Sequence, residues 1–114
     1  MINWELLDDD SKLKQAIEQS FTKDIVIFKH STTCSISLMA KKRIEDDWDA
    51  EIDVTPYYLD LKSYRYISNE VAERFQVEHE SPQVLLIRNG ACIYDASHFD
   101  ITVAELKETI AFHA

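Results

Sequence analysis

The sequence predicts a single α/β domain over residues 1–114, with a mixed central β-sheet and helices on both of its faces. The length and a hydrophobic content of 46% suit one globular domain. Two apolar runs, Ile25–Phe28 and Val84–Ile87, are typical of short strands buried on both faces. Asn89-Gly90 lies just after the second run and is a strong signal for a tight β-hairpin, so the sheet should contain an antiparallel pair.

Helical and strand patterns alternate through the first half of the chain. Apolar residues recur at helical spacing over about residues 10–20, before the strand at Ile25–Phe28. A polar loop then leads into a second helical pattern over about residues 34–49, which is followed by a strand candidate at Thr55–Asp60. Ile2–Leu6 is a further candidate for a short strand. The first helical stripe consists of Leu13, Ala16, Ile17 and Phe21.

Ser68 marks the expected start of a third helix. A serine hydroxyl at an N-cap accepts a hydrogen bond from the first turn, and Ile67 and Ala72 are spaced to pack across such a start. This helix is expected to run through Phe75 and to end before Ser81-Pro82, where the chain should turn.

The C-terminal part should form the hairpin and a closing helix. Ala91–Tyr94 is the returning strand of the hairpin. Thr102 and Glu105 have the spacing of a capping box, and the helix that they open should continue through Ile110. The resulting order, α-β-α-β-α-β-β-α, implies a parallel βαβ portion followed by a C-terminal antiparallel hairpin.

Composition excludes several classes of function. The net charge of −9 would repel phosphate groups, so neither nucleic acid nor an anionic membrane surface is an expected partner. The single glycine, Gly90, leaves no glycine-rich loop for a nucleotide phosphate. No apolar run approaches the roughly 20 residues of a membrane span, and the N-terminus lacks the basic and apolar regions of a signal peptide.

Cysteine usage indicates the redox compartment. The two cysteines, Cys34 and Cys92, are too few for a disulfide scaffold, which favours a cytoplasmic protein with reduced thiols. Neither the cysteines nor the four scattered histidines have the spacing of zinc ligands, so no bound metal is expected.

Cys34 is the residue best placed for chemistry. It follows the strand Ile25–Phe28 where the next helix begins, and sites in α/β sheets form beyond the carboxyl ends of parallel strands. The free N–H groups of a helix start favour the thiolate, and Lys29 and His30 are expected to add positive potential. Ser81-Pro82 is either an ordinary trans turn or a cis-proline that faces the thiol, and the residues alone favour the trans turn.

These features together resemble a known fold and family. The strand, the thiol at the helix start and the Ser-Pro before the hairpin resemble the thioredoxin fold, and Cys34-Ser35-Ile36-Ser37 resembles its C-x-x-C motif with serine as the last residue. The segments Phe28–Ser37, Tyr57–Leu61 and His79–Leu86 are similar to the monothiol bacilliredoxin family, and the resemblance covers nearly the whole chain. One departure is Ser35, where many members are expected to have proline.

The resemblance implies a cytoplasmic enzyme that removes bacillithiol, a low-molecular-weight thiol, from S-thiolated client proteins. Cys34 would be the nucleophile, and Pro82 would be cis beside it. No bound cofactor is implied, because bacillithiol is a co-substrate, and a second small thiol or a thioredoxin-type reductase must release it from Cys34. The residues expected to bind substrate or stabilise the thiolate are Thr33, Ser35, Ser37, Ser81, Pro82, His30 and Lys29.

Two alternatives remain open from the sequence. Cys92 follows Ala91 in an apolar strand, so it is either a small buried side chain or a resolving thiol that pairs with Cys34. The domain itself could also be a non-catalytic thioredoxin-fold module that binds a partner, or a redox sensor that is modified at Cys34 without turnover.

Overall fold

The structure, a computed structural model, describes residues 2–49 and 51–112. Within these residues the chain forms five β-strands and four α-helices. The elements are β1 Glu5–Leu6, α1 Asp10–Gln19, β2 Ile25–His30, α2 Ser35–Asp47, β3 Thr55–Asp60, α3 Arg65–Phe75, β4 Gln83–Arg88, β5 Ala91–Ser97, a short 3₁₀ helix η1 His98–Asp100, and α4 Val103–Phe112. None of these helices has the length and apolar character needed to cross a membrane.

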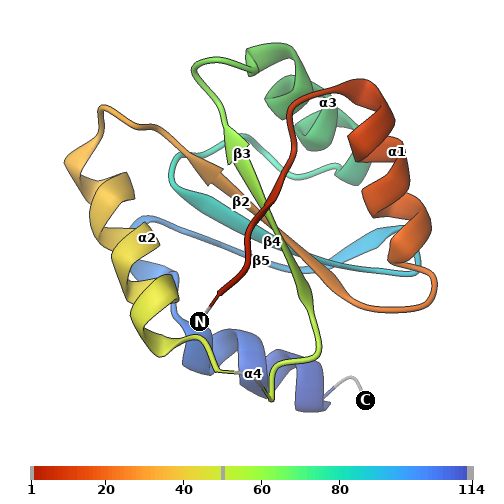
Figure 1. Ribbon diagram of the computed structural model, residues 1–114, viewed down its shortest axis with the longest axis vertical. Helices are drawn as coiled ribbons and strands as arrows, with labels where there is room; N and C mark the ends of the chain where they lie inside the picture. Colours follow the sequence, from red (N-terminus) through yellow and green to blue (C-terminus); the bar gives the residue numbers. More distant parts are fainter. Residues whose placement is uncertain (1, 50, 113–114) are drawn as a thin grey trace.

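A mixed sheet with the strand order β1-β3-β2-β4-β5 forms the centre of the molecule. Strands β1, β3 and β2 are parallel, whereas β4 runs antiparallel to both β2 and β5. Figure 1 shows α1 and α3 on one face of the sheet and α2 and α4 on the other. The predicted α/β fold with a parallel portion and a C-terminal hairpin is therefore confirmed.

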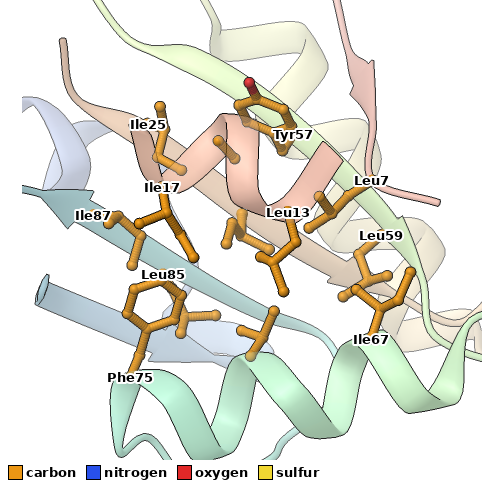
Figure 2. Packing of buried hydrophobic residues seen from close by; sticks show 13 residues of the cluster. Leu7, Leu13, Ile17, Ile25, Tyr57, Leu59, Ile67, Phe75, Leu85 and Ile87 are labelled. Atoms are coloured by element: carbon orange, nitrogen blue, oxygen red, sulfur yellow. The ribbon is translucent and has the colours of Figure 1, made fainter. Parts of the chain in front are cut away.

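Each face of the sheet has its own hydrophobic core, and β2 contributes to both. Ile25 and Ile27 pack in the core beneath α1 and α3, whereas Val26 and Phe28 pack in the core beneath α2 and α4. This follows from the strand geometry, in which successive side chains point to opposite faces. Figure 2 shows the first core, in which side chains from the sheet meet those from α1 and α3. By the same alternation, the side chains of the last two residues of β2, Lys29 and His30, point to opposite faces of the sheet.

The β4–β5 turn has the predicted hairpin geometry. Asn89 and Gly90 have φ values of 53° and 76°, the left-handed region that this turn requires. Phe21 was expected in the buried stripe of the first helix, but it is 58% exposed because α1 ends at Gln19. Its ring instead covers Gly90, where an added Cβ would lie 2.8 Å from the ring.

Helix α3 begins earlier than predicted. It starts at Arg65 with Tyr64 as its N-cap, and Ser68 lies buried inside the helix. The N-cap prediction was wrong because Ile67, Val71 and Phe75 form one buried stripe that begins before the serine.

Other boundaries differ by a few residues. Strand β5 extends past Tyr94 because Ser97 still pairs with Gln83, and β1 is confined to two residues of the Ile2–Leu6 segment. The start of α4 is as predicted, because the Glu105 N–H donates to Thr102 Oγ1 over 3.2 Å.

Candidate active site

Cys34 lies at the N-cap of α2, beyond the carboxyl end of β2. Its N–H donates to the Ser31 carbonyl over 3.2 Å, and its own carbonyl accepts the Leu38 N–H over 3.0 Å. The thiol is free and partly exposed. No side chain caps this end of α2, so the first-turn N–H groups present their partial positive charge close to the sulfur. The predicted position of Cys34 at a helix start is thus confirmed.

Ser37, the last residue of the C-x-x-S motif, is fully buried. Its Oγ accepts the Ser31 N–H over 3.0 Å and lies 2.7 Å from His30 Nδ1. These two contacts tie the loop that carries Cys34 to the end of β2. Ser37 therefore stabilises the Cys34 loop through its buried contacts with His30 and Ser31.

His30 points toward α2 and is only 1% exposed. Its ring stacks on Phe28 at a centroid distance of 5.6 Å and lies 5.5 Å from the ring of Tyr58. Burial, with the charge of Lys41, lowers the pKa of His30 below its usual 6.5 despite the opposing charges of Asp60 and Glu45. The ring is therefore neutral near pH 7, and it acts on the loop through hydrogen bonding.

Lys29 points to the opposite face of β2, toward α3, and is fully buried. Its Nζ donates to the Ser68 carbonyl over 3.1 Å and lies 3.3 Å from His79 Nδ1. Burial lowers the pKa of Lys29 to about 8. The two residues that the sequence places just upstream of Cys34 thus lie on different faces of the sheet.

The Ser81-Pro82 bond is cis, as the family resemblance implied. Gln83 pairs with Lys29, near the end of β2 that leads into the Cys34 loop. Pro82, the residue just before Gln83, therefore lies at the same end of the sheet as this loop. The Pro82 carbonyl accepts the His98 N–H over 3.0 Å, which connects this segment to η1. Ser81 Oγ is buried and finds no hydrogen-bond partner among the described residues.

The exposed rim of the loop contains Thr33 and Ser35, and Lys62 joins them from the β3–α3 connection. Lys62 Nζ donates to Thr33 Oγ1 over 3.2 Å. Sequence reasoning missed this lysine, although the available signal was its place just after the strand Thr55–Asp60. That strand is parallel to β2 and ends at the same edge of the sheet.

Cys92 lies at the other end of the sheet. It pairs with Ile87, and Ile87 pairs with Ile25, the first residue of β2. Cys34 lies beyond the last residue of β2, so the length of β2, roughly 17 Å, separates the two cysteines along the strand direction. The Cα atoms of a disulfide lie within about 7 Å of each other. Figure 1 shows the β4–β5 turn and the start of α2 at opposite ends of the sheet. Cys92 therefore cannot pair with Cys34 in this fold, and burial raises its pKa to about 11.

No three His, Cys, Asp or Glu side chains among residues 2–49 and 51–112 lie close enough together to hold a metal ion.

Comparison with known proteins identifies the family. A family model described as monothiol bacilliredoxin BrxC matches residues 5–106. The chain belongs to this family. A solved structure described as a candidate oxidoreductase with a thioredoxin fold is 32% identical to this bacilliredoxin, with a TM-score of 0.83 over 94% of this chain and 93% of the other.

Two thioredoxins show the same fold at lower identity. The thioredoxin of Malassezia sympodialis is 22% identical, with a TM-score of 0.76 over 99% of this chain and 92% of the other. The thioredoxin of Fasciola hepatica is 19% identical, with a TM-score of 0.71 over 96% and 99% of the two chains. The bacilliredoxin family and the oxidoreductase neighbour support a thiol redox function for this chain.

Proposed function

We propose that this bacilliredoxin is a cytoplasmic monothiol oxidoreductase that removes bacillithiol from protein mixed disulfides. The observation that carries the proposal is the position of Cys34: a partly exposed thiol at an uncapped helix start, at the same end of the sheet as the cis-Pro82 segment. At such a position an incoming disulfide can reach the sulfur, next to the partial positive charge of the helix start.

The reaction is a thiol–disulfide exchange in two steps. The Cys34 thiolate attacks the bacillithiol sulfur of the mixed disulfide, a new Cys34–bacillithiol disulfide forms, and the client leaves as a thiolate that takes up a proton. A second bacillithiol thiolate, or a thiolate of a thioredoxin-type reductase, then attacks the bacillithiol sulfur, forms a new disulfide with it, and releases Cys34 as a thiolate. Because Cys92 is out of reach, the second step requires this external thiol.

The neighbouring side chains divide the remaining tasks. Thr33, Ser35 and Lys62 form the exposed rim and would contact the small thiol. His30 and Ser37 keep the loop in position from within. On the other side of the site, the backbone at Ser81 would pair with an extended segment of the client.

A de-thiolation assay with matched cysteine variants tests this proposal. Wild-type protein and Cys92→Ala should both restore the free thiol of a bacillithiolated client, whereas Cys34→Ser should have no activity. Without added bacillithiol, mass spectrometry should find one bacillithiol on Cys34 and none on Cys92. Full activity of Cys34→Ser, or adduct on Cys92 alone, would show the proposal to be wrong.

The isolation of Cys34 from Cys92 also favours a second candidate, a redox sensor that holds the adduct without transferring it. The same assay distinguishes the two, because a sensor takes up one bacillithiol per chain and then stops even when free bacillithiol is supplied. Repeated turnover under these conditions identifies the enzyme.

A further inference from the structure

A buried lysine lies on the face of the sheet opposite the Cys34 loop, and the exchange reaction does not use it. Lys29 has no exposed surface, and its two hydrogen-bond partners, the Ser68 carbonyl and His79 Nδ1, carry no negative charge. Burying an amine without a carboxylate is unfavourable, because it loses its hydration and gains no ion pair.

The contacts of Lys29 converge on the segment that leads from α3 to Pro82. His79 Nδ1 lies 3.3 Å from Lys29 Nζ and 3.3 Å from Ser68 Oγ. Gln83, which pairs with Lys29 across the ladder, donates its side-chain N–H to the Glu78 carbonyl over 2.9 Å. The backbone at residues 78–79 is thus held against β2, α3 and β4 a few residues before the cis bond.

The geometry separates this segment from the Cys34 loop. Lys29 and His30 are consecutive, so their side chains project to opposite faces of β2. His30 reaches Ser37 and the Cys34 loop, whereas Lys29 reaches His79. The end of one strand therefore anchors the two halves of the site independently.

We propose that the Lys29–His79 contact positions the Ser81-Pro82 segment for client docking, and that Lys29 and His79 are positioning residues with no role in the sulfur chemistry. This inference rests on the proposed function, because it concerns where the client's extended backbone would pair. Ser68 supports the contact from α3, since its carbonyl meets Lys29 and its hydroxyl meets His79.

The contact requires an unprotonated Nδ1 on His79, because the lysine has only donors to offer. Burial and the charges of Lys29 and Arg65 lower the pKa of His79 below 6.5, against the opposing charge of Glu80. The imidazole is therefore neutral near pH 7 and can accept from Lys29. Below the lowered pKa both partners are cations, and the hydrogen bond between Lys29 and His79 is lost.

Two substitutions at His79 separate positioning from chemistry. His79→Leu removes the acceptor, whereas the Oδ1 of His79→Asn takes the place of Nδ1. We expect His79→Leu to raise KM for a bacillithiolated client by about five-fold, or about 1 kcal/mol, with kcat little changed. His79→Asn should stay within about two-fold of wild type. Alkylation of Cys34 by iodoacetamide should proceed at the wild-type rate in both variants.

Hydrogen exchange provides a readout that does not depend on activity. In His79→Leu, amides of residues 77–81 should exchange faster, and amides of residues 31–38 should be unchanged. An unchanged KM in His79→Leu, or a loss of kcat and alkylation rate together, would overturn the proposal, as would unchanged exchange at residues 77–81. Wild-type protein that does not turn over would contradict the proposed function alone, and the exchange result would still test the Lys29–His79 contact.

Discussion

Substituting Lys29 with methionine should make the protein more stable at neutral pH and less stable at alkaline pH. Burial lowers the pKa of Lys29 from its ordinary 10.5 to about 8. Each pKa unit corresponds to about 1.4 kcal/mol, so the buried ammonium lowers the free energy of unfolding by about 3 kcal/mol at pH 7. Methionine fills similar space and carries no charge.

The sign of the pH effect follows from proton binding. Between pH 8 and 10.5 the unfolded chain keeps a proton on Lys29 that the folded protein has lost, so the free energy of unfolding rises with pH. The destabilisation by the ammonium shrinks from about 3 kcal/mol at pH 7 to about 1 kcal/mol at pH 9.5. Lys29→Met also loses two hydrogen bonds, to Ser68 and His79, which contribute about 1 kcal/mol each. We therefore expect Lys29→Met to be about 1 kcal/mol more stable than wild type at pH 7 and about 1 kcal/mol less stable at pH 9.5.

Urea unfolding at the two pH values measures this change of about 2 kcal/mol between the proteins. Other groups that titrate at alkaline pH, such as Cys92, are present in both proteins and cancel in the difference. Lys42→Met is the matched control, because Lys42 is exposed and forms only an i,i+4 ion pair with Asp46. A difference between wild type and Lys29→Met that is the same at pH 7 and pH 9.5 would refute the reasoning.

Two further predictions concern the loop and the second thiol. Ser37→Ala should lower the free energy of unfolding, measured in urea, by about 1–3 kcal/mol, because it leaves His30 Nδ1 and the Ser31 N–H buried without their partner. Ser35→Ala, which alters an exposed hydroxyl, is the control, and equal stabilities of the two variants would contradict this account. At pH 8, iodoacetamide should label Cys34 and leave Cys92 largely unmodified, since burial raises the pKa of Cys92 to about 11. Peptide mapping that finds both cysteines labelled at similar rates would contradict this expectation.

Local signals predicted most of the fold, and the errors occurred where long-range partners decide. The Asn89-Gly90 turn and the apolar runs depend on neighbours in the sequence, and they were predicted correctly. Ser68 was predicted as an N-cap because serine is favoured at helix starts, yet its hydroxyl contacts His79, which only the folded chain brings near. The strand at Ile25–Phe28 was ended too early because polar residues follow it, although those residues are buried in the sheet.

In the candidate active site, too, local features were predicted from the sequence and contacts between distant segments were not. The place of Cys34 at a helix start was predicted, because the order of strand, loop and helix along the chain specifies it, whereas the cis bond at Pro82 followed only from the family resemblance. The contact of Lys62 with Thr33 was not, because it joins two loops that meet only once β2 and β3 lie parallel. The distance between the two cysteines likewise depends on the strand register, which composition and spacing do not supply.

The source of positive potential at Cys34 differs from the sequence expectation. His30 is neutral near pH 7, and the charge of Lys29 lies on the other face of β2, next to His79. The groups that remain on the thiol side are the uncapped first-turn N–H groups of α2 and the exposed Lys62 beside Thr33. The dipole of a helix start is part of the backbone, so it persists through side-chain substitutions, whereas Lys62 lies in solvent and its effect is screened by salt. The partial positive charge at the end of α2 that carries Cys34 therefore comes from the backbone, and the buried polar residues of β2 hold the loops on either side of it.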